Sequence, residues 1–470
     1  MLKRKAYKNL LEWKQQKGHG ALLVTGARQI GKTYLLEEFA RNEYESYVKI
    51  DFVKDFAARS RYGKITSSGQ ATDLLSLELG RPLEPGKTLI FFDEVQEAPE
   101  VVTLSKYLVQ DGRFDLALSG SMLGTELNGI RSLPVGYLHI LDMTPLTFEE
   151  FCWAQGVPDT ILESVRENFA QRLPMPDAMH DSLVKLFDRY LVVGGMPAAV
   201  CKSIEGTRDL GSVRQVQDDL VRLYREDISK YAKKRAPQIK AIFDALPSQL
   251  NKENKRFQLK AIEGEAKYDR FANDFAWLVA ACVALKVTNV TDPKPMLAKT
   301  AEPNRFKLYS SDVGMLMAQY PPSVAMAALT GEKAVNFGAV YENYVAQELS
   351  AAGVGLHYYH NSRKGEVDFL IETTEGKVLP IEVKSGKDYK LHTALNNLLS
   401  TKEYGINEAI VLSRANVFTE DRDGGEIVYL PLYMGGLVAE LGASRASSKS
   451  ILENVHLEPI EWRYCASAKP

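Results

Sequence analysis

The stretch ALLVTGARQIGKT, residues 21–33, decides the fold. Its first five residues form an apolar run that predicts a buried β-strand, and the apolar spacing over 32–40 predicts a helix. The loop between them consists of Gly26, Ala27, Arg28, Gln29, Ile30, Gly31, Lys32 and Thr33, and it fits the pattern G-x-x-x-x-G-K-[ST]. A strand, this loop and a helix in direct succession predict an α/β domain with a phosphate-binding loop (P-loop).

The residue types in the loop suit the binding of ATP with Mg²⁺. Gly26 and Gly31 let backbone N–H groups turn toward phosphate oxygens, and the start of the helix adds partial positive charge. Lys32 is expected to reach the β- and γ-phosphates, and the Thr33 hydroxyl is expected to contact Mg²⁺. We therefore predict that all eight loop residues bind nucleotide, with ATP and Mg²⁺ as the cofactors.

Two further apolar segments end in residues that suit the same site. LIFFDE, residues 89–94, predicts a strand that delivers Asp93 at its C-terminal end, where a carboxylate can hold Mg²⁺. Glu94 is then placed to polarise the attacking water. LALSGS, residues 116–121, predicts another strand, and Ser119 or Ser121 is a candidate to bind that water or the γ-phosphate. An ordinary strand-end turn explains either serine equally well.

The pattern of apolar residues divides the chain into successive units. The predicted units are an α/β ATPase core over 1–150, a helical lid over 151–235, a winged-helix-like connector over 236–325, an α/β domain over 326–440 and a C-terminal tail over 441–470. The connector is predicted from short helices followed by a strand pair, 284–290 and 306–310. The fold class is therefore α/β with several units.

Charged residues in the C-terminal unit fall on two neighbouring predicted strands. Asp368 lies in GEVDFLI, residues 365–371, while Glu382 and Lys384 share one face of the next strand. Glu342, on the preceding predicted helix, can join them. Two carboxylates that hold Mg²⁺ beside a lysine suit phosphodiester hydrolysis, so Asp368, Glu382 and Lys384 are predicted catalytic residues. Surface salt bridges between strands are the alternative explanation.

Six short motifs occur in order along the chain. They are GARQIGKT (26–33), FFDEVQ (91–96), LSGSMLG (118–124), PLTFEEF (145–151), RYLVVGGMP (189–197) and LYREDISKY (223–231). Together they resemble the prokaryotic AAA-plus ATPases that carry a C-terminal domain of restriction-endonuclease-like fold, over roughly residues 3 to 435. The resemblance implies that Thr33 and Asp93 are magnesium contacts and that Glu94 activates water. It also implies that Asp368, Glu382 and Glu342 are metal ligands beside Lys384.

One departure from this family pattern concerns the arginine that completes many ATPase sites. Many relatives have a basic residue after the glycine just before the PLxFEEF segment. Here that stretch is Pro134-Val135-Gly136-Tyr137, which has no cation. Arg131 and Arg113 are the nearest candidates for an arginine finger.

Composition narrows the environment and the partners. The net charge of −2 over 470 residues gives no global sign of a nucleic-acid partner, although the stretch 252–260 is basic. That stretch either contacts DNA phosphates or forms a solvated face. The chain lacks an apolar run of the about 20 residues that cross a membrane, and its four cysteines form no CxxC pair. We expect a cytoplasmic protein without zinc.

Two functions fit these features. In the first, ATP binding and hydrolysis control a DNA-acting C-terminal domain, with nuclease activity as one form of that action. In the second, the nucleotide state switches the binding of a protein or DNA partner, and no phosphodiester is cut. A homo-oligomer is a further expectation, because AAA-plus proteins often form rings.

Overall fold

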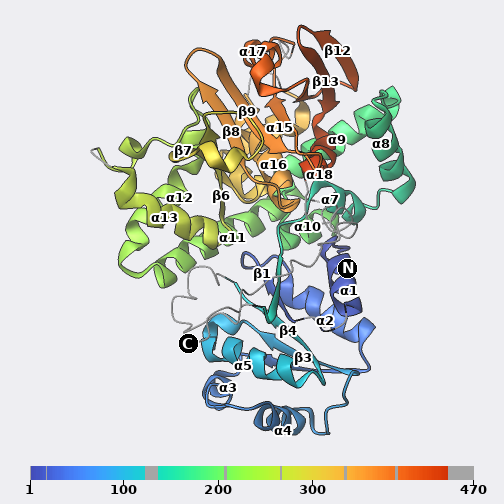
Figure 1. Ribbon diagram of the computed structural model, residues 1–470, viewed down its shortest axis with the longest axis vertical. Coiled ribbons are helices and arrows are strands. Elements are labelled where there is room, and N and C mark those ends of the chain that lie inside the picture. The colour runs from blue at the N-terminus through green and yellow to red at the C-terminus, as the bar shows by residue number, and fades with distance from the viewer. Residues whose placement is uncertain are drawn as a thin grey trace, which may run out of the picture.

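The computed structural model describes residues 2–16, 18, 20–121, 136–205, 209–264, 267–332, 336–386 and 390–442. An α/β unit lies at one end of the molecule and a second sheet lies at the other, with helices between them (Figure 1). Of the residues predicted above, Arg131, Pro134 and Val135 lie outside the described residues.

The N-terminal unit is built on a parallel five-stranded sheet with the order β2-β3-β4-β1-β5. Its strands are β1 (Ala21–Thr25), β2 (Ser46–Asp51), β3 (Thr88–Asp93), β4 (Asp115–Ser119) and β5 (Leu138–Asp142). Its helices are α1 (Ala6–Gln15), α2 (Lys32–Glu43), α3 (Phe56–Tyr62), α4 (Ser68–Leu79) and α5 (Pro99–Asp111). Every position of β3 is buried, as expected for a central strand of a sheet covered on both faces.

This sheet confirms the α/β fold predicted from the P-loop sequence. The carboxyl ends of β1, β3 and β4 lie at the same edge, because the three strands are parallel. The P-loop follows β1, Asp93 ends β3 and Ser119 ends β4. The predicted nucleotide residues are therefore brought to one edge of the sheet by topology alone.

A helical region follows and joins the two ends of the molecule. Its helices are α7 (Phe148–Ala154), α8 (Asp159–Gln171), α9 (Asp177–Val193), α10 (Pro197–Ile204) and α11 (Leu210–Tyr231). Between α9 and α10 the backbone makes a close contact with the segment after β5, where Leu146 N donates to Gly195 O over 2.7 Å. A Cβ atom on Gly195 would lie 2.1 Å from Leu146 O, so this contact requires glycine.

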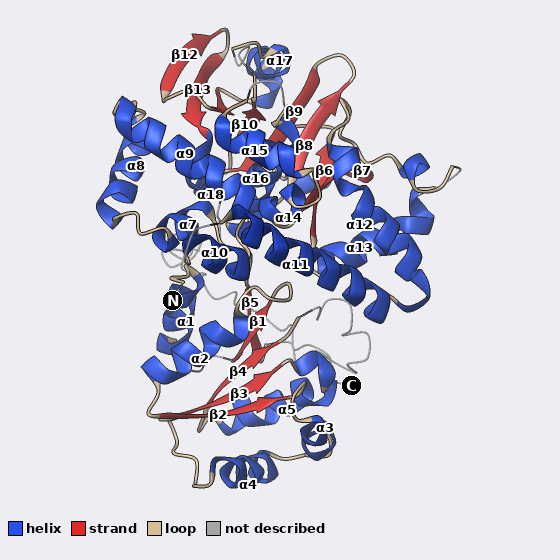
Figure 2. Ribbon diagram, turned by 180° about the vertical axis from the view of Figure 1, so that it is seen from behind, coloured by secondary structure: helices blue, strands red, loops and turns tan. Residues whose placement is uncertain are grey.

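The C-terminal sheet has eight strands in the order β12-β13-β11-β10-β9-β8-β6-β7, and its strands mix parallel and antiparallel pairs. The strands are β6 (Ala284–Val290), β7 (Ala301–Ser310), β8 (His357–Asn361), β9 (Gly365–Glu372), β10 (Val378–Val383), β11 (Glu408–Ser413), β12 (Phe418–Arg422) and β13 (Gly425–Pro431). The helices are α12 (Ala236–Leu250), α13 (Tyr268–Ala280), α14 (Val313–Met317), α15 (Pro322–Thr330), α16 (Gly338–Ala351), α17 (Thr393–Ser400) and α18 (Gly435–Gly442). Helix α16 is buried along almost its whole length, which places it in the core beside this sheet (Figure 2).

The predicted strand pair of the connector is confirmed, and it has a second partner. Strands β6 and β7 pair in antiparallel fashion, and β6 also pairs in parallel with β8. The predicted connector and the predicted C-terminal domain therefore share one continuous sheet. Side chains on β7 can reach the C-terminal carboxylates for this reason. Within the described residues, no helix is both long and apolar enough to span a bilayer.

Candidate functional site

The P-loop adopts backbone angles that its glycines make accessible. Gly31 has φ 88° and forms the N-cap of α2, so the loop turns directly into the helix. Gly26 has φ 134°, and a Cβ atom there would lie 2.2 Å from Met143 O. Because of the positive φ at both glycines and the close backbone approach at Gly26, any other residue at these positions would be energetically costly. The loop is thus shaped as a cradle of backbone N–H groups at a helix start, which suits phosphate.

Lys32 is the buried cation of this loop. Its side chain is 5% exposed, and Nζ donates to Gly26 O over 3.1 Å and to Ala27 O over 2.8 Å. Burial lowers the pKa of Lys32, while the nearby carboxylates of Glu94 and Asp93 oppose that shift. A buried ammonium group held by two carbonyl oxygens can exchange these partners for phosphate oxygens, which carry full charge.

The predicted magnesium residues lie in direct contact. Thr33 Oγ1 donates to Asp93 Oδ1 and Oδ2 over 2.9 and 3.0 Å, and Ser119 Oγ donates to Asp93 Oδ1. A hydroxyl and a carboxylate beside a phosphate cradle are the protein ligands that Mg²⁺ uses in nucleotide sites. These residues therefore fit a Mg²⁺ ion that arrives with ATP.

Lys49 is a member of this site that sequence reasoning missed. Its Nζ lies 2.9 Å from Asp93 Oδ2 and 2.8 Å from Glu37 Oε1. Burial opposes its charge, but hydrogen bonds to Glu37 and Asp93 outweigh burial and raise the pKa of Lys49. The signal available in the sequence was a lysine inside the apolar strand SYVKID.

Glu94 is fixed at the position after β3 by three hydrogen bonds. Its backbone has φ 57°, and its N–H donates to Ser119 Oγ over 3.2 Å. Its Oε2 accepts from Gln96 Nε2 over 2.5 Å and from Ser121 Oγ over 3.2 Å. Ser119 thus contacts both Asp93 and Glu94, whereas Ser121 contacts Glu94 and Gln96. Gln96 was not predicted, although it lies within the FFDEVQ motif.

Of the two predicted arginines, only Arg113 is described, and it lies away from the P-loop of this chain. Arg113 lies before β4, at the sheet edge opposite the carboxyl ends, and pairs with Asp111 over 2.5 Å. The other candidate, Arg131, is not described. The loop's own Arg28 instead points to helix α11, where NH1 donates to Asp227 Oδ1 over 2.5 Å and NH2 donates to Tyr231 OH over 2.7 Å.

Arg28 therefore connects the P-loop to a helix that contacts the C-terminal half. Tyr224, on the same helix, donates from its hydroxyl to Arg28 O over 3.3 Å. Tyr231 OH donates to Glu97 Oε1 over 3.3 Å, which extends the network to the segment after β3. Helix α11 packs on α10, α12 and α14. Helix α11 is therefore one of the elements in direct contact with the P-loop.

The C-terminal residues predicted from sequence converge, with an additional lysine between them. Lys307 on β7 is fully buried, and its Nζ lies 2.7 Å from Glu366 Oε1, 3.3 Å from Asp368 Oδ1 and 3.7 Å from Glu342 Oε2. Burial opposes the charge of Lys307, but the surrounding acidic groups hold its pKa well above its ordinary value. The sequence contains the signal, a lysine inside the apolar run RFKLY.

Glu342 has two more partners from the segment before it. Tyr309 OH donates to Glu342 Oε2 over 2.8 Å, and Lys255 Nζ donates to Glu342 Oε1. Lys255 belongs to the basic stretch for which the sequence suggested DNA contact or a solvated face. It instead forms an ion pair with a buried carboxylate.

Glu382 and Lys384 lie beside this cluster and pair with each other over 2.8 Å. Burial and the nearby Asp368 raise the pKa of Glu382 to about 8. Its Oε2 is buried and has no hydrogen-bond partner in the described part of the chain. Asp368 Oδ2 accepts from Val383 N over 2.9 Å, which places Asp368 next to the same strand. No group of three or more His, Cys, Asp or Glu side chains among the described residues is arranged to hold a metal ion.

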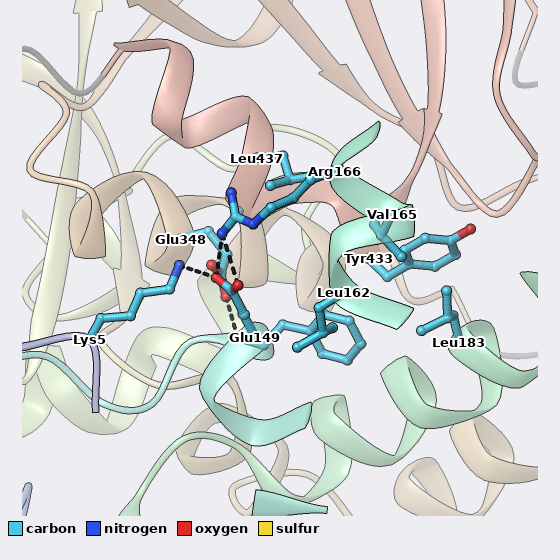
Figure 3. Close-up of a pocket in the computed structure, with 11 residues that line it drawn as sticks. Lys5, Glu149, Leu162, Val165, Arg166, Leu183, Glu348, Tyr433 and Leu437 are labelled. Atoms are coloured by element: carbon cyan, nitrogen blue, oxygen red, sulfur yellow. Dashed lines mark hydrogen bonds and ion pairs between the residues drawn. The ribbon is translucent and has the colours of Figure 1, made fainter. Parts of the chain in front are cut away.

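A pocket lies away from both sites, where α7, α8, α16 and α18 meet the N-terminal segment (Figure 3). Glu149 lies at its centre and pairs with Lys5 over 2.5 Å and with Arg166 over 2.8 Å. Glu348, from α16, accepts from Phe148 N over 2.8 Å. The helical region and the C-terminal half meet at this pocket.

The parallel sheet, the glycine-rich loop and the Thr33–Asp93 contact give the N-terminal unit the arrangement of a P-loop domain. Residues 18–152 match the family model of an AAA domain. Residues 184–324 and 337–433 match the models of two domains of unknown function, DUF8612 and DUF4143. A search of the curated proteins finds no match.

Two solved structures were matched to this chain. ORC1 from Aeropyrum pernix, in complex with DNA, is 12% identical, and the match covers 71% of this chain and 93% of that chain with a TM-score of 0.27. Cdc6p from Pyrobaculum aerophilum is 11% identical, and the match covers 69% and 91% with a TM-score of 0.23.

Proposed function

We propose that this chain binds and hydrolyses ATP with Mg²⁺ at the P-loop. One observation carries the proposal, which is the contact of Thr33 with Asp93 beside the buried Lys32. The match of residues 18–152 to an AAA domain supports it. All three side chains lie at the edge of the sheet where the glycine cradle opens.

Each of these residues has a role that follows from its position. Bound Mg²⁺ would neutralise charge on the phosphates, and Thr33 and Asp93 would hold it. Lys32 would bind the β- and γ-phosphates in place of its two carbonyl partners. Glu94 would accept the proton of the attacking water, and Gln96 and Ser121 would hold its carboxylate in orientation.

We further propose that the nucleotide state changes the binding of a DNA or protein partner by the C-terminal half, without cleavage. Arg28 supports the transmission, because it joins the P-loop to α11 through Asp227. Lys307 supports the absence of cleavage, because it occupies the centre of the carboxylate cluster. The second candidate, a nuclease, is favoured by the convergence of Asp368 and Glu342 on one side chain.

Two variants test the ATPase assignment. Lys32→Ala should lose ATP binding and keep a normal thermal unfolding curve. Glu94→Gln should bind ATP as the wild type does, while turnover falls about 100-fold or more, since general bases contribute about that factor. Binding is measured with a fluorescent ATP analogue, and turnover by phosphate release. Normal affinity in Lys32→Ala would refute the site, and normal turnover in Glu94→Gln would move the base to another residue.

A further inference from the structure

We propose that Lys307 acts as the built-in cation of the C-terminal carboxylate cluster and occupies the place of a divalent metal. The inference goes beyond the ATPase, since it concerns the other end of the molecule. It makes the C-terminal centre a closed, non-cleaving site in the wild type. It also implies that removal of this one ammonium group opens a divalent-cation site.

The distances around the lysine carry the first step. Three carboxylates from α16 and β9 surround Lys307 Nζ, at 2.7 Å for Glu366, 3.3 Å for Asp368 and 3.7 Å for Glu342. A magnesium or calcium ion would need the same oxygens at about 2.0–2.6 Å from its own centre. The ammonium group and the ion would therefore compete for one position.

The formal charge of the cluster also supports the inference that Lys307 takes the place of a divalent cation. Three carboxylic groups (Glu342, Glu366 and Asp368) face two lysines (Lys255 and Lys307), while Glu382 and Lys384 pair with each other. With all of them ionised, one negative charge remains, and a divalent cation added to that set would leave a buried positive charge. Without Lys307 two negative charges remain, which one divalent cation balances. Buried charges are stable only when they are balanced in this way.

The origin of the cations carries the third step. Lys307 lies on strand β7, and Lys255 lies in an earlier segment whose Arg256 pairs with Lys307. Both lysines lie inside the match to DUF8612. Glu342, Glu366 and Asp368 lie inside the match to DUF4143. The acidic groups thus come from one unit, and two of the cations that neutralise them come from the unit before it. The shared sheet holds β7 in place, because β6 pairs with β8.

The test compares Mn²⁺ binding by the full-length, nucleotide-free chain in four forms, measured from the electron paramagnetic resonance signal of free Mn²⁺. The forms are wild type, Asp368→Asn, Lys307→Met and the double variant Lys307→Met/Asp368→Asn. We expect the wild type and Asp368→Asn to bind Mn²⁺ equally. Lys307→Met should bind one additional Mn²⁺, with an affinity at least about tenfold above that of the wild type. The double variant should lose this gain. Lys286→Met, on the neighbouring strand β6, is the matched control and should behave as the wild type.

Two results would overturn the proposal. One is Mn²⁺ binding in the wild type that Asp368→Asn removes, and the other is no gain in Lys307→Met. Should Lys307→Met fold poorly, its melting temperature should rise with Mn²⁺ and that of the double variant should not; no rise would also overturn the proposal. ATP turnover is measured on the same samples, so a failure of this inference is distinguishable from a failure of the ATPase assignment.

Discussion

Single buried charges define both candidate sites at the scale of the residue. Asp93 is 1% exposed and contacts Thr33, Ser119 and Lys49, while Lys307 is fully buried among carboxylates. An unpaired charge in either position would cost several kcal/mol, so the partners are needed for folding as well as for chemistry. Substitution of one partner should therefore affect stability together with binding.

Glu348 gives a prediction for the dependence of stability on pH. Burial raises its pKa from an ordinary 4.5 to about 7. The folded state then binds more protons than the unfolded state between these values, so the free energy of unfolding decreases as pH rises from 4.5 to about 7. Glu348→Gln should remove this loss, which is worth up to about 3 kcal/mol. In melting curves, the stability of the variant relative to that of the wild type should increase from pH 5 to pH 8.

Glu149, in the same pocket, provides a control for which we expect the opposite dependence of stability on pH. Burial opposes its ionisation, but the ion pairs with Lys5 and Arg166 outweigh burial and lower the pKa of Glu149. Its contribution is present above its ordinary pKa and is lost as pH falls below it. Glu149→Gln should therefore lose stability at pH 8 relative to the wild type and approach it in acid. The same trend in both variants would contradict the assignments.

The contact between the α9–α10 turn and the segment after β5 gives a prediction at the scale of the element. A methyl group at Gly195 would lie 2.1 Å from Leu146 O and displace the hydrogen bond that joins the two segments. Gly195→Ala should destabilise the protein by about 1–3 kcal/mol, as overpacking does. Urea unfolding measures the loss.

The matched control for that substitution is Gly69→Ala in α4. Nothing lies within 4 Å of a Cβ atom at Gly69, and alanine favours a helix over glycine. This variant should keep or slightly raise stability. An equal loss of stability in both variants would show that the close contact of Gly195 with Leu146 O does not cause the destabilisation.

Elements that carry strong local patterns could be predicted from sequence, and their distant partners could not. The predicted strands 21–25, 284–290 and 306–310 all exist, because short apolar runs with turn residues around them are local signals. The pairing of β6 with β8 joins residues 288–290 to 357–359, and no local pattern encodes it. For that reason the connector was expected to be separate from the C-terminal sheet.

The same distinction applies to the sites. Thr33 and Asp93 follow known offsets from their strands, and the structure places them in contact. Their binding of Mg²⁺ stays a prediction. Lys49 and Lys307 contribute through contacts across a sheet, where only a lysine in an apolar strand gives a hint. The contact of Arg28 with Asp227 on α11 likewise joins residues almost 200 positions apart.

Among the contacts at the scale of the whole molecule, two routes link the P-loop unit to the C-terminal half. The first runs from Arg28 to α11. The second runs through the segment after β5, since Tyr190 OH donates to Leu146 O over 2.5 Å and Gln347 Nε2 donates to Tyr190 OH over 2.8 Å. Helix α16, which carries Gln347, also carries Glu342 of the carboxylate cluster. Under the proposed function, nucleotide binding at the P-loop would alter packing at the C-terminal half through these contacts.

The central claim is that nucleotide bound at the P-loop is sensed by α11, and hydrogen–deuterium exchange tests it most directly. Exchange of residues 223–231 is measured in Glu94→Gln, which retains ATP, with Mg²⁺ and either ATP, ADP or no nucleotide. We predict about tenfold slower exchange in this segment with ATP, and no such change in Glu94→Gln/Asp227→Ala at saturating ATP. Equal exchange in all three nucleotide states of Glu94→Gln, with ATP bound, would contradict the claim.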